Sequence, residues 1–289
     1  MKDLKAWANR TMLARNRLKF IIRVVIFLAF FVYYCFFRNE ILLFLEQDFF
    51  GSLRTGGLHV LHLLWFLFVF MMLRHLFPPS TFSMSLRKSE RDTCREAEGY
   101  DREKLRAYVR EENRKAVVLM IYWVVFNLVF FILYLTGVLD KADLLMISVF
   151  YFLGDYVCIL LFCPYQTYIM HSGCCVNCRA YDWGHLFMFT PMLFYFSFYS
   201  FSLFLLGLAV FIRWEVLFLK HPERFWAGSN LALRCNECGE KTCRHKKALA
   251  AHFPLKIRFI PEKAKMGLLL GLLVIFWVVV SAILKKLNL

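Results

Sequence analysis

The chain has 289 residues, of which 60% are hydrophobic and 18% aromatic. This exceeds the roughly half-apolar composition of soluble domains, and the gathering of apolar residues into long runs excludes an ordinary soluble fold. The net charge of +15 does not indicate nucleic-acid binding, because the basic residues flank the apolar runs, where a membrane protein faces anionic lipid.

Apolar runs near the ~20 residues needed to cross about 30 Å of hydrocarbon as a helix recur along the chain. The first begins after nineteen residues and has no small-residue cleavage site behind it, so we interpret it as a retained span. The sequence therefore predicts an all-α polytopic membrane protein, a single domain over residues 1–289 with six to seven transmembrane or re-entrant helices. The runs are 20–37, 58–77, 116–137, 144–163, 186–212 and 266–284.

The charges between the first runs predict which segments share a side of the membrane. Residues 1–19 are basic and suit an amphipathic segment on the bilayer surface, with a cytoplasmic N-terminus. Residues 38–57 are more acidic and suit the opposite face. Residues 80–115, dense in Glu, Lys and Arg after Pro78–Pro79, predict a charged cytoplasmic helix. We expect a bacterial-type cytoplasmic (inner) membrane.

Polar side chains inside the runs are few, and Asp155 in "YFLGDYVC" is the clearest intramembrane acid. A buried carboxylate is costly and indicates either a proton or ion path or a cationic partner. We expect Asp155 to mark an intramembrane polar site or to pair structurally, with Arg213 as one candidate. Arg23 lies close to the end of its span and can extend its side chain to the interface.

The fifth run decides the topology. As a single span, 186–212 would place residues 213–265, with twelve Lys or Arg, outside the cell, against the positive-inside rule. Alternatively, residues 183–220 form a helical hairpin that turns near Tyr199–Ser200, with arms of about 27 Å. The hairpin places residues 163–185 and 213–265 together as a cytoplasmic cap rich in Cys and His, and we adopt it.

The ten cysteines are unevenly distributed. Cys35, Cys94 and Cys158 are isolated in the sequence, and we expect them to be inert. The other seven fall into two groups within the cap, and thiols on a cytoplasmic face stay reduced, so metal binding or redox chemistry is expected. The candidate metal ligands are Cys163, His171, Cys174, Cys175, Cys178, Cys235, Cys238, Cys243 and His245.

Two CxxC knuckles, at 175–178 and 235–238, carry the leading interpretation. A CxxC turn presents two thiolates to one ion, and two knuckles on one side of the membrane make a tetrahedral zinc site. The sequence thus predicts zinc as a cofactor that ties two cap loops into a structural or interaction module. Cys243 and His245 could replace one pair, or build a second site with Cys163, His171 or Cys174.

Three alternatives stay open. Seven thiols exceed the needs of one zinc, so an iron–sulfur cluster exchanging electrons with a membrane quinone or partner enzyme is the second hypothesis. Thiol–disulfide exchange at Cys174–Cys175 or a CxxC is the third. A lipid-acting enzyme would need a polar cavity around Asp155, His185 and residues 221–224, which the sequence does not show. Expected partners are membrane lipids and a redox or protein partner at the cap, without nucleic acid; the sequence does not indicate the oligomeric state.

Overall fold

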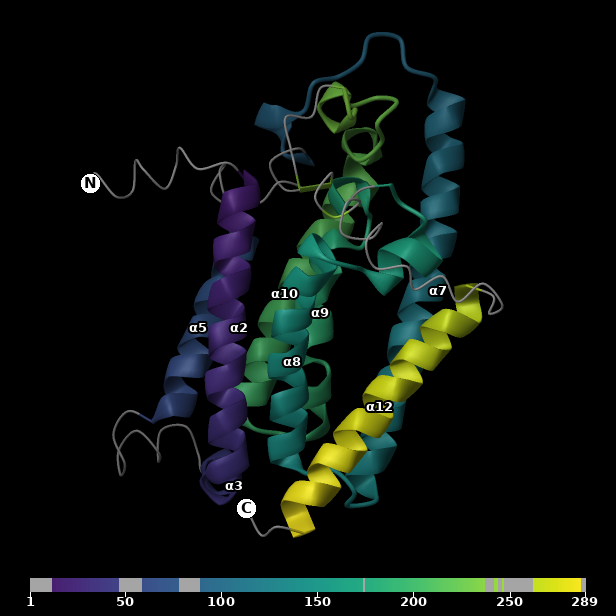
Figure 1. The fold of residues 1–289 in the computed structure, drawn as a ribbon. Helices are drawn as coiled ribbons and strands as arrows, with labels where there is room; N and C mark the ends of the chain where they lie inside the picture. The colour runs from purple at the N-terminus through teal and green to yellow at the C-terminus, as the bar shows by residue number, and fades with distance from the viewer. Residues whose placement is uncertain are drawn as a thin grey trace, which may run out of the picture.

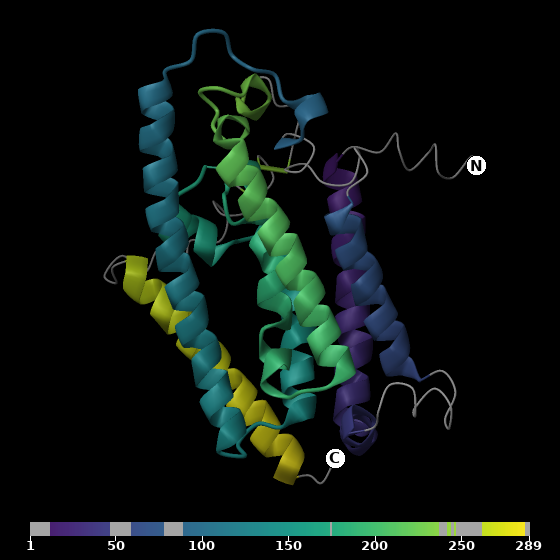
Figure 2. The ribbon, with the colours of Figure 1, turned by 180° about the vertical axis from the view of Figure 1, so that it is seen from behind.

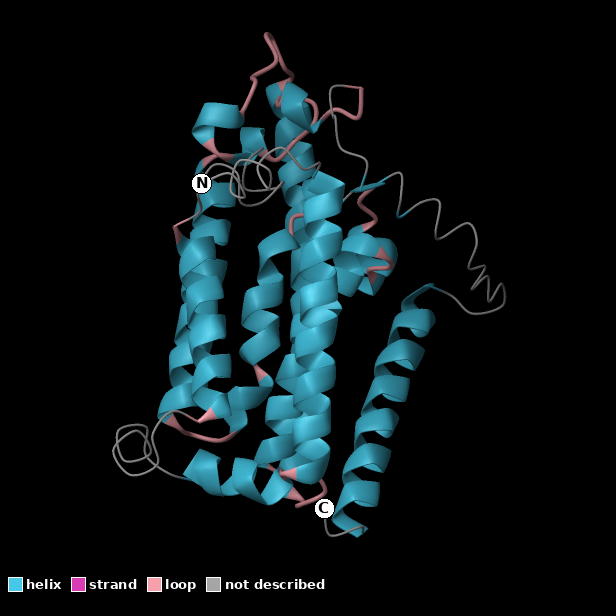
Figure 3. Cartoon of the chain, turned by 60° about the vertical axis from the view of Figure 1, so that its left-hand side comes forward, coloured by secondary structure: helices cyan, strands magenta, loops and turns pink. Residues whose placement is uncertain are grey.

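The computed structural model describes residues 12–46, 59–77, 89–173, 175–236, 242, 243, 246 and 262–286. Within these residues the chain is built of helices and loops and contains no strand (Figure 1, Figure 3). Of the predicted N-terminal amphipathic segment over 1–19, residues 12–19 belong to the first long helix, and residues 1–11 lie outside the described residues.

Five helices in the described residues are long and apolar enough to cross a membrane. This confirms the prediction of an all-α membrane protein. A shorter apolar helix, α5, corresponds to the run 58–77, and α3 follows the first span. Their bounds are α2 Met12–Phe36, α3 Arg38–Glu46, α5 Val60–Leu76, α7 Arg102–Leu135, α8 Lys141–Leu160, α10 Phe198–Lys220 and α12 Glu262–Lys286.

The helices alternate in direction, so that the bundle has two ends (Figure 1, Figure 2). We call the cap end the one at which α2, α7 and α12 begin and α5, α8 and α10 finish. The base is the opposite end, where α3 lies and the chain turns from α7 into α8. Two contacts of Arg38 hold the base together: its guanidinium lies 3.0 Å from Asp143 and 2.6 Å from Asp140, at the start of α8.

The fifth run forms two segments, and the hairpin is present. A descending arm made of α9 Gly184–Phe189 and the 3-10 turn η5 Pro191–Phe194 is followed by α10. The turn lies before the predicted position, because Ser197 caps α10 and starts it at Phe198. The arms touch closely: a Cβ on Gly207 would lie 2.8 Å from the carbonyl oxygen of His185.

The charged helix predicted over 80–115 begins later. Helix α7 starts at Arg102, where the Asp101 side chain accepts hydrogen bonds from two backbone N–H groups of the first turn. Residues 102–115 are therefore helical and continue directly into the third apolar run, 116–137, within the same helix. Residues 89–101 contain a 3-10 turn, an antiparallel bridge between Glu96 and Asn230 and a turn at Gly99, and 80–88 lie outside the described residues.

Candidate metal centre

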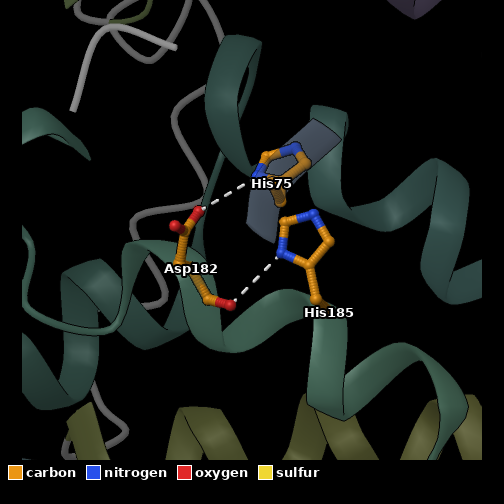
Figure 4. Close-up of side chains that lie close together, drawn as sticks. All are labelled: His75, Asp182 and His185. Carbon is orange, nitrogen blue, oxygen red and sulfur yellow. Dashed lines mark hydrogen bonds and ion pairs between the residues drawn. The ribbon is translucent and has the colours of Figure 1, made fainter. Parts of the chain in front are cut away.

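Three side chains from separate segments converge at the cap end. His75 lies in the last turn of α5, Asp182 in the 3-10 turn η4 Tyr181–Trp183, and His185 in α9 (Figure 4). One ligand atom of each lies within 4.8 Å of the others. The two imidazole rings have centroids 3.9 Å apart, and Nδ1 of His75 lies 3.5 Å from Oδ1 of Asp182.

The local sequence explains why Asp182 and His185 share a face. The 3-10 turn runs directly into α9, so that residues three apart lie one above the other. Trp183, between them, donates from Nε1 to Oε1 of Glu215 at 2.8 Å and fixes the turn against α10. Gly184 leaves room for a carboxylate from α8, since a Cβ there would lie 3.2 Å from Oδ1 of Asp155.

The hydrogen bond of His185 decides which ring nitrogen carries the proton. Its Nδ1 lies 3.2 Å from the backbone carbonyl oxygen of Asp182, which can only accept, so Nδ1 must donate. Nε2 then carries the lone pair. A ring nitrogen held by a backbone carbonyl, with the other nitrogen unprotonated, is the usual arrangement of a histidine that ligates a metal.

The carboxylate of Asp182 is deeply buried, with the residue 1% exposed. Within the described part of the chain, neither of its oxygens has a hydrogen-bond partner, and neither does Nε2 of His185. Burial raises the pKa of Asp182 to about 6. A buried carboxylate without donors is unfavourable unless a cation lies beside it, and a metal ion is the cation that two neighbouring imidazoles would help to bind.

This donor set fits a divalent transition metal. Two imidazole nitrogens and one carboxylate oxygen suit zinc or iron(II), and three protein ligands leave positions for water or a substrate. The cluster is the only group of three or more potential His, Cys, Asp or Glu ligands at this spacing among the residues that the structure describes. The candidate metal centre therefore contains no thiol.

A cavity of about 240 Å³ adjoins these three side chains. Three cationic residues line it, Lys19 and Arg23 from α2 and Lys246 from the chain between α10 and α12, together with Asp155. A cavity therefore lies around Asp155 and His185, two of the three places at which a lipid-acting enzyme would need one. The segment 221–224 is not among its lining residues.

Asp155 pairs with Arg23, not with Arg213. The Arg23 guanidinium lies 2.8 Å from Oδ2 of Asp155 and 4.2 Å from the ring centroids of Phe152 and Tyr156. Arg23 is 7% exposed, so its side chain stays inside the bundle, contrary to the expectation that it extends to the interface. Arg23 reaches Asp155 because α2 packs along α8. Arg213 lies at the cap end and pairs with Glu90 at 2.7 Å instead.

Two pairs of polar contacts involve the thiols near the end of α8 and in the cap segment that follows it. The Cys175 Sγ donates to Oε1 of Gln166 at 3.1 Å and accepts from Nζ of Lys246 at 3.3 Å. The thiol of Cys158 hydrogen-bonds to Cys163 and lowers the pKa of the Cys163 thiol. The expectation that Cys158 is isolated is therefore wrong, because the chain turns back after α8 and brings Cys163 beside it.

The remaining predicted ligands are dispersed or lie outside the described residues. Cys178 is buried, which raises its pKa to about 12, whereas Cys235 is exposed. Cys243 lines the polar cavity, and His171 is exposed. A zinc site shared by the two CxxC knuckles stays a prediction. Cys174, Cys238 and His245 lie outside the described residues.

Sequence reasoning did not identify His75 and Asp182 as ligands. The signal that could have found Asp182 is the spacing Asp-x-x-His in "YDWGH", which places both side chains on one helical face. His75 belongs to a distant helix, and only the packing of α5 against α10 brings it to the site. Searches of protein-family models, curated proteins and solved structures gave no match to this chain.

Proposed function

We propose that this chain is an integral membrane metalloprotein in which His75, Asp182 and His185 bind one divalent transition-metal ion at the cap end. The observation that carries the proposal is the orientation of His185. Its Nδ1 is engaged by the Asp182 carbonyl oxygen at 3.2 Å, which leaves Nε2 unprotonated, and one ligand atom of each of the three residues lies within 4.8 Å of the others. When bound, the ion would supply Lewis-acid chemistry to a ligand in the adjoining cavity.

Zinc remains the first choice of metal, as the sequence predicts, but on different ligands. Two histidines and one carboxylate with an open position are typical of catalytic zinc, whereas four thiolates are typical of structural zinc. Iron(II) is the second choice for the same nitrogen and oxygen donors. The iron–sulfur hypothesis requires thiolate ligands and would move the metal to the CxxC knuckles.

Metal content tests the proposal. Protein purified anaerobically in detergent should contain about one zinc or iron ion per chain. His185→Gln and Asp182→Asn should each lose the ion, because each removes a ligand atom. His221→Gln is the matched control, since this histidine is half-exposed and pairs with Glu223 at 3.1 Å, outside the cavity. It should keep the metal.

A second measurement separates ligand loss from misfolding. Excess zinc should raise the melting temperature of the wild type and of His221→Gln but not of the ligand variants, because an ion that binds only the folded state stabilises it by mass action. If Cys178→Ser and Cys235→Ser lose the metal while His185→Gln keeps it, the proposal is wrong and the shared thiolate site is supported.

We also propose that the cap end faces the cytoplasm. The chain leaves α10 and enters α12 at this end, so the segment 221–261, with eight Lys or Arg, connects two helix ends of the cap end, and four more Lys or Arg lie in the adjoining turns of α10 and α12. Positively charged loops of this length stay on the cytoplasmic side. The same end carries the first residues of α2 and of α7, whose charges predict the same orientation.

A further inference from the structure

A second cavity, of about 320 Å³, lies beside the cavity of the metal centre. It is lined mainly by apolar and aromatic side chains of α7, α8 and α12, among them Trp123, Tyr151 and Leu273. Figures 1 and 2 show α7 and α12 together on one side of α8. The lining residues of these three helices lie within the candidate membrane spans, so this part of the cavity lies along the spans. Its walls offer contact to a hydrocarbon chain and little to a charged ligand.

The two cavities are adjacent. Their common lining residues are Asp155, Ile159, Phe162, Gln166, Cys175 and Tyr181. One ligand could therefore extend from the polar cavity into the apolar one. Phe162 and its neighbour Leu161 are each 39% exposed, so the shared wall also reaches the surface that lipid would contact.

The charge of the polar cavity favours an anion. Its cationic residues are Lys19, Arg23 and Lys246, and its acids are Asp155 and Asp182, so three positive charges and two negative charges leave +1. A divalent ion on the metal centre would raise this to about +3. Phosphate matches such a site, because it accepts charge-assisted hydrogen bonds and coordinates metal ions.

We propose that the two cavities together bind one phosphate-bearing membrane lipid, with its headgroup next to the metal centre and an acyl chain in the apolar cavity. The proposal rests on the proposed metal site for the headgroup, whereas the acyl-chain half rests on the second cavity alone. A soluble phosphate compound would use only the polar cavity. The adjoining apolar cavity, at the depth of the spans, is what favours a lipid.

Gly154 offers a way to fill the apolar cavity without disturbing the fold. This glycine lines the cavity, and a Cβ added there would meet no atom within 4 Å. Gly154→Leu should therefore occupy the space of the acyl chain. Gly271→Leu is the matched control, because Gly271 also has no atom within 4 Å of an added Cβ but does not line either cavity.

The experiment uses zinc-loaded protein in phosphatidylcholine nanodiscs that contain phosphatidic acid brominated on its acyl chains. Bromine quenches tryptophan on contact, and the difference between wild type and Trp123→Phe isolates the signal of Trp123. We expect saturable quenching of Trp123, retained in Gly271→Leu and lost in Gly154→Leu. Lys246→Met should weaken binding by about tenfold or more, because it removes a charge-assisted donor, whereas exposed Lys104→Met should not.

The outcomes separate the two proposals. If quenching persists in protein that metal analysis shows to bind no ion, the metal centre is refuted and the lipid cavity is supported. If the protein binds zinc and inorganic phosphate but Trp123 is not quenched, the lipid proposal is refuted. Equal quenching by brominated diacylglycerol, which lacks the phosphate, would refute the headgroup assignment.

Discussion

Replacement of Asp155 by Asn should destabilise the protein far more than an equivalent change at its surface. The Arg23–Asp155 pair is 2.8 Å long, with side chains 8% and 18% exposed. Asp155→Asn removes the negative charge and leaves the Arg23 guanidinium inside the bundle, where it still donates to the carbonyl oxygen of Phe152 at 2.5 Å and lies over two aromatic rings.

The magnitude follows from burial. Opposite unit charges 4 Å apart attract by about 1 kcal/mol in water and by about 4 kcal/mol at an effective dielectric constant of ~20. Breaking a buried pair by removing one partner costs about 3–5 kcal/mol. The Arg213–Glu90 pair has nearly the same length, 2.7 Å, but its side chains are 28% and 38% exposed, and such surface pairs contribute about 0–1 kcal/mol. Asp155→Asn should therefore cost at least about 2 kcal/mol more than Glu90→Gln.

Reversible unfolding by SDS in mixed micelles, followed by circular dichroism, measures the free energy of unfolding of both variants. The double variant Arg23→Met/Asp155→Asn should cost less than the sum of the two single changes, because it leaves no unpaired charge. The reasoning would be refuted by equal costs for Asp155→Asn and Glu90→Gln, or by strict additivity in the double variant.

Three further outcomes are expected. Gly207→Ala should lower both the melting temperature and the metal content, because its Cβ would lie 2.8 Å from the His185 carbonyl oxygen, whereas Gly154→Ala has open space and should change neither. Below pH 10, a short pulse of iodoacetamide should alkylate the exposed Cys235 but not Cys178, since burial raises the pKa of Cys178 to about 12 and only the thiolate reacts. Mass spectrometry of the peptides measures both, and equal labelling of the two cysteines would contradict the prediction. A membrane-impermeant maleimide should reach Cys235 in inverted but not in right-side-out vesicles, and the reverse result would contradict a cytoplasmic cap.

The fold was largely predictable because each long helix is also a long apolar run. Hydrophobic length identifies such spans without tertiary information. The hairpin followed from charge, since twelve cationic residues after the fifth run could not be placed outside. Its turn was misplaced by a few residues, because Ser197 is a local capping signal that hydrophobicity does not report.

The candidate metal centre was predictable only in part. The clustered cysteines are the most conspicuous candidate ligands in the sequence. His75, at the end of α5, has no other candidate ligand near it in the sequence, and only the fold brings it beside His185. The ion pair of Asp155 was misassigned for a similar reason, since Arg23 reaches it through the packing of α2 on α8. Contacts between helices distant in the chain leave no trace in a single sequence.

X-ray absorption at the edge of the bound metal tests the central claim most directly. If His75, Asp182 and His185 hold the ion, the first shell should contain only nitrogen and oxygen, at about 2.0–2.2 Å for zinc, with the outer-shell scattering of two imidazoles. A sulfur shell near about 2.3 Å would contradict this account and place the metal on the CxxC thiolates.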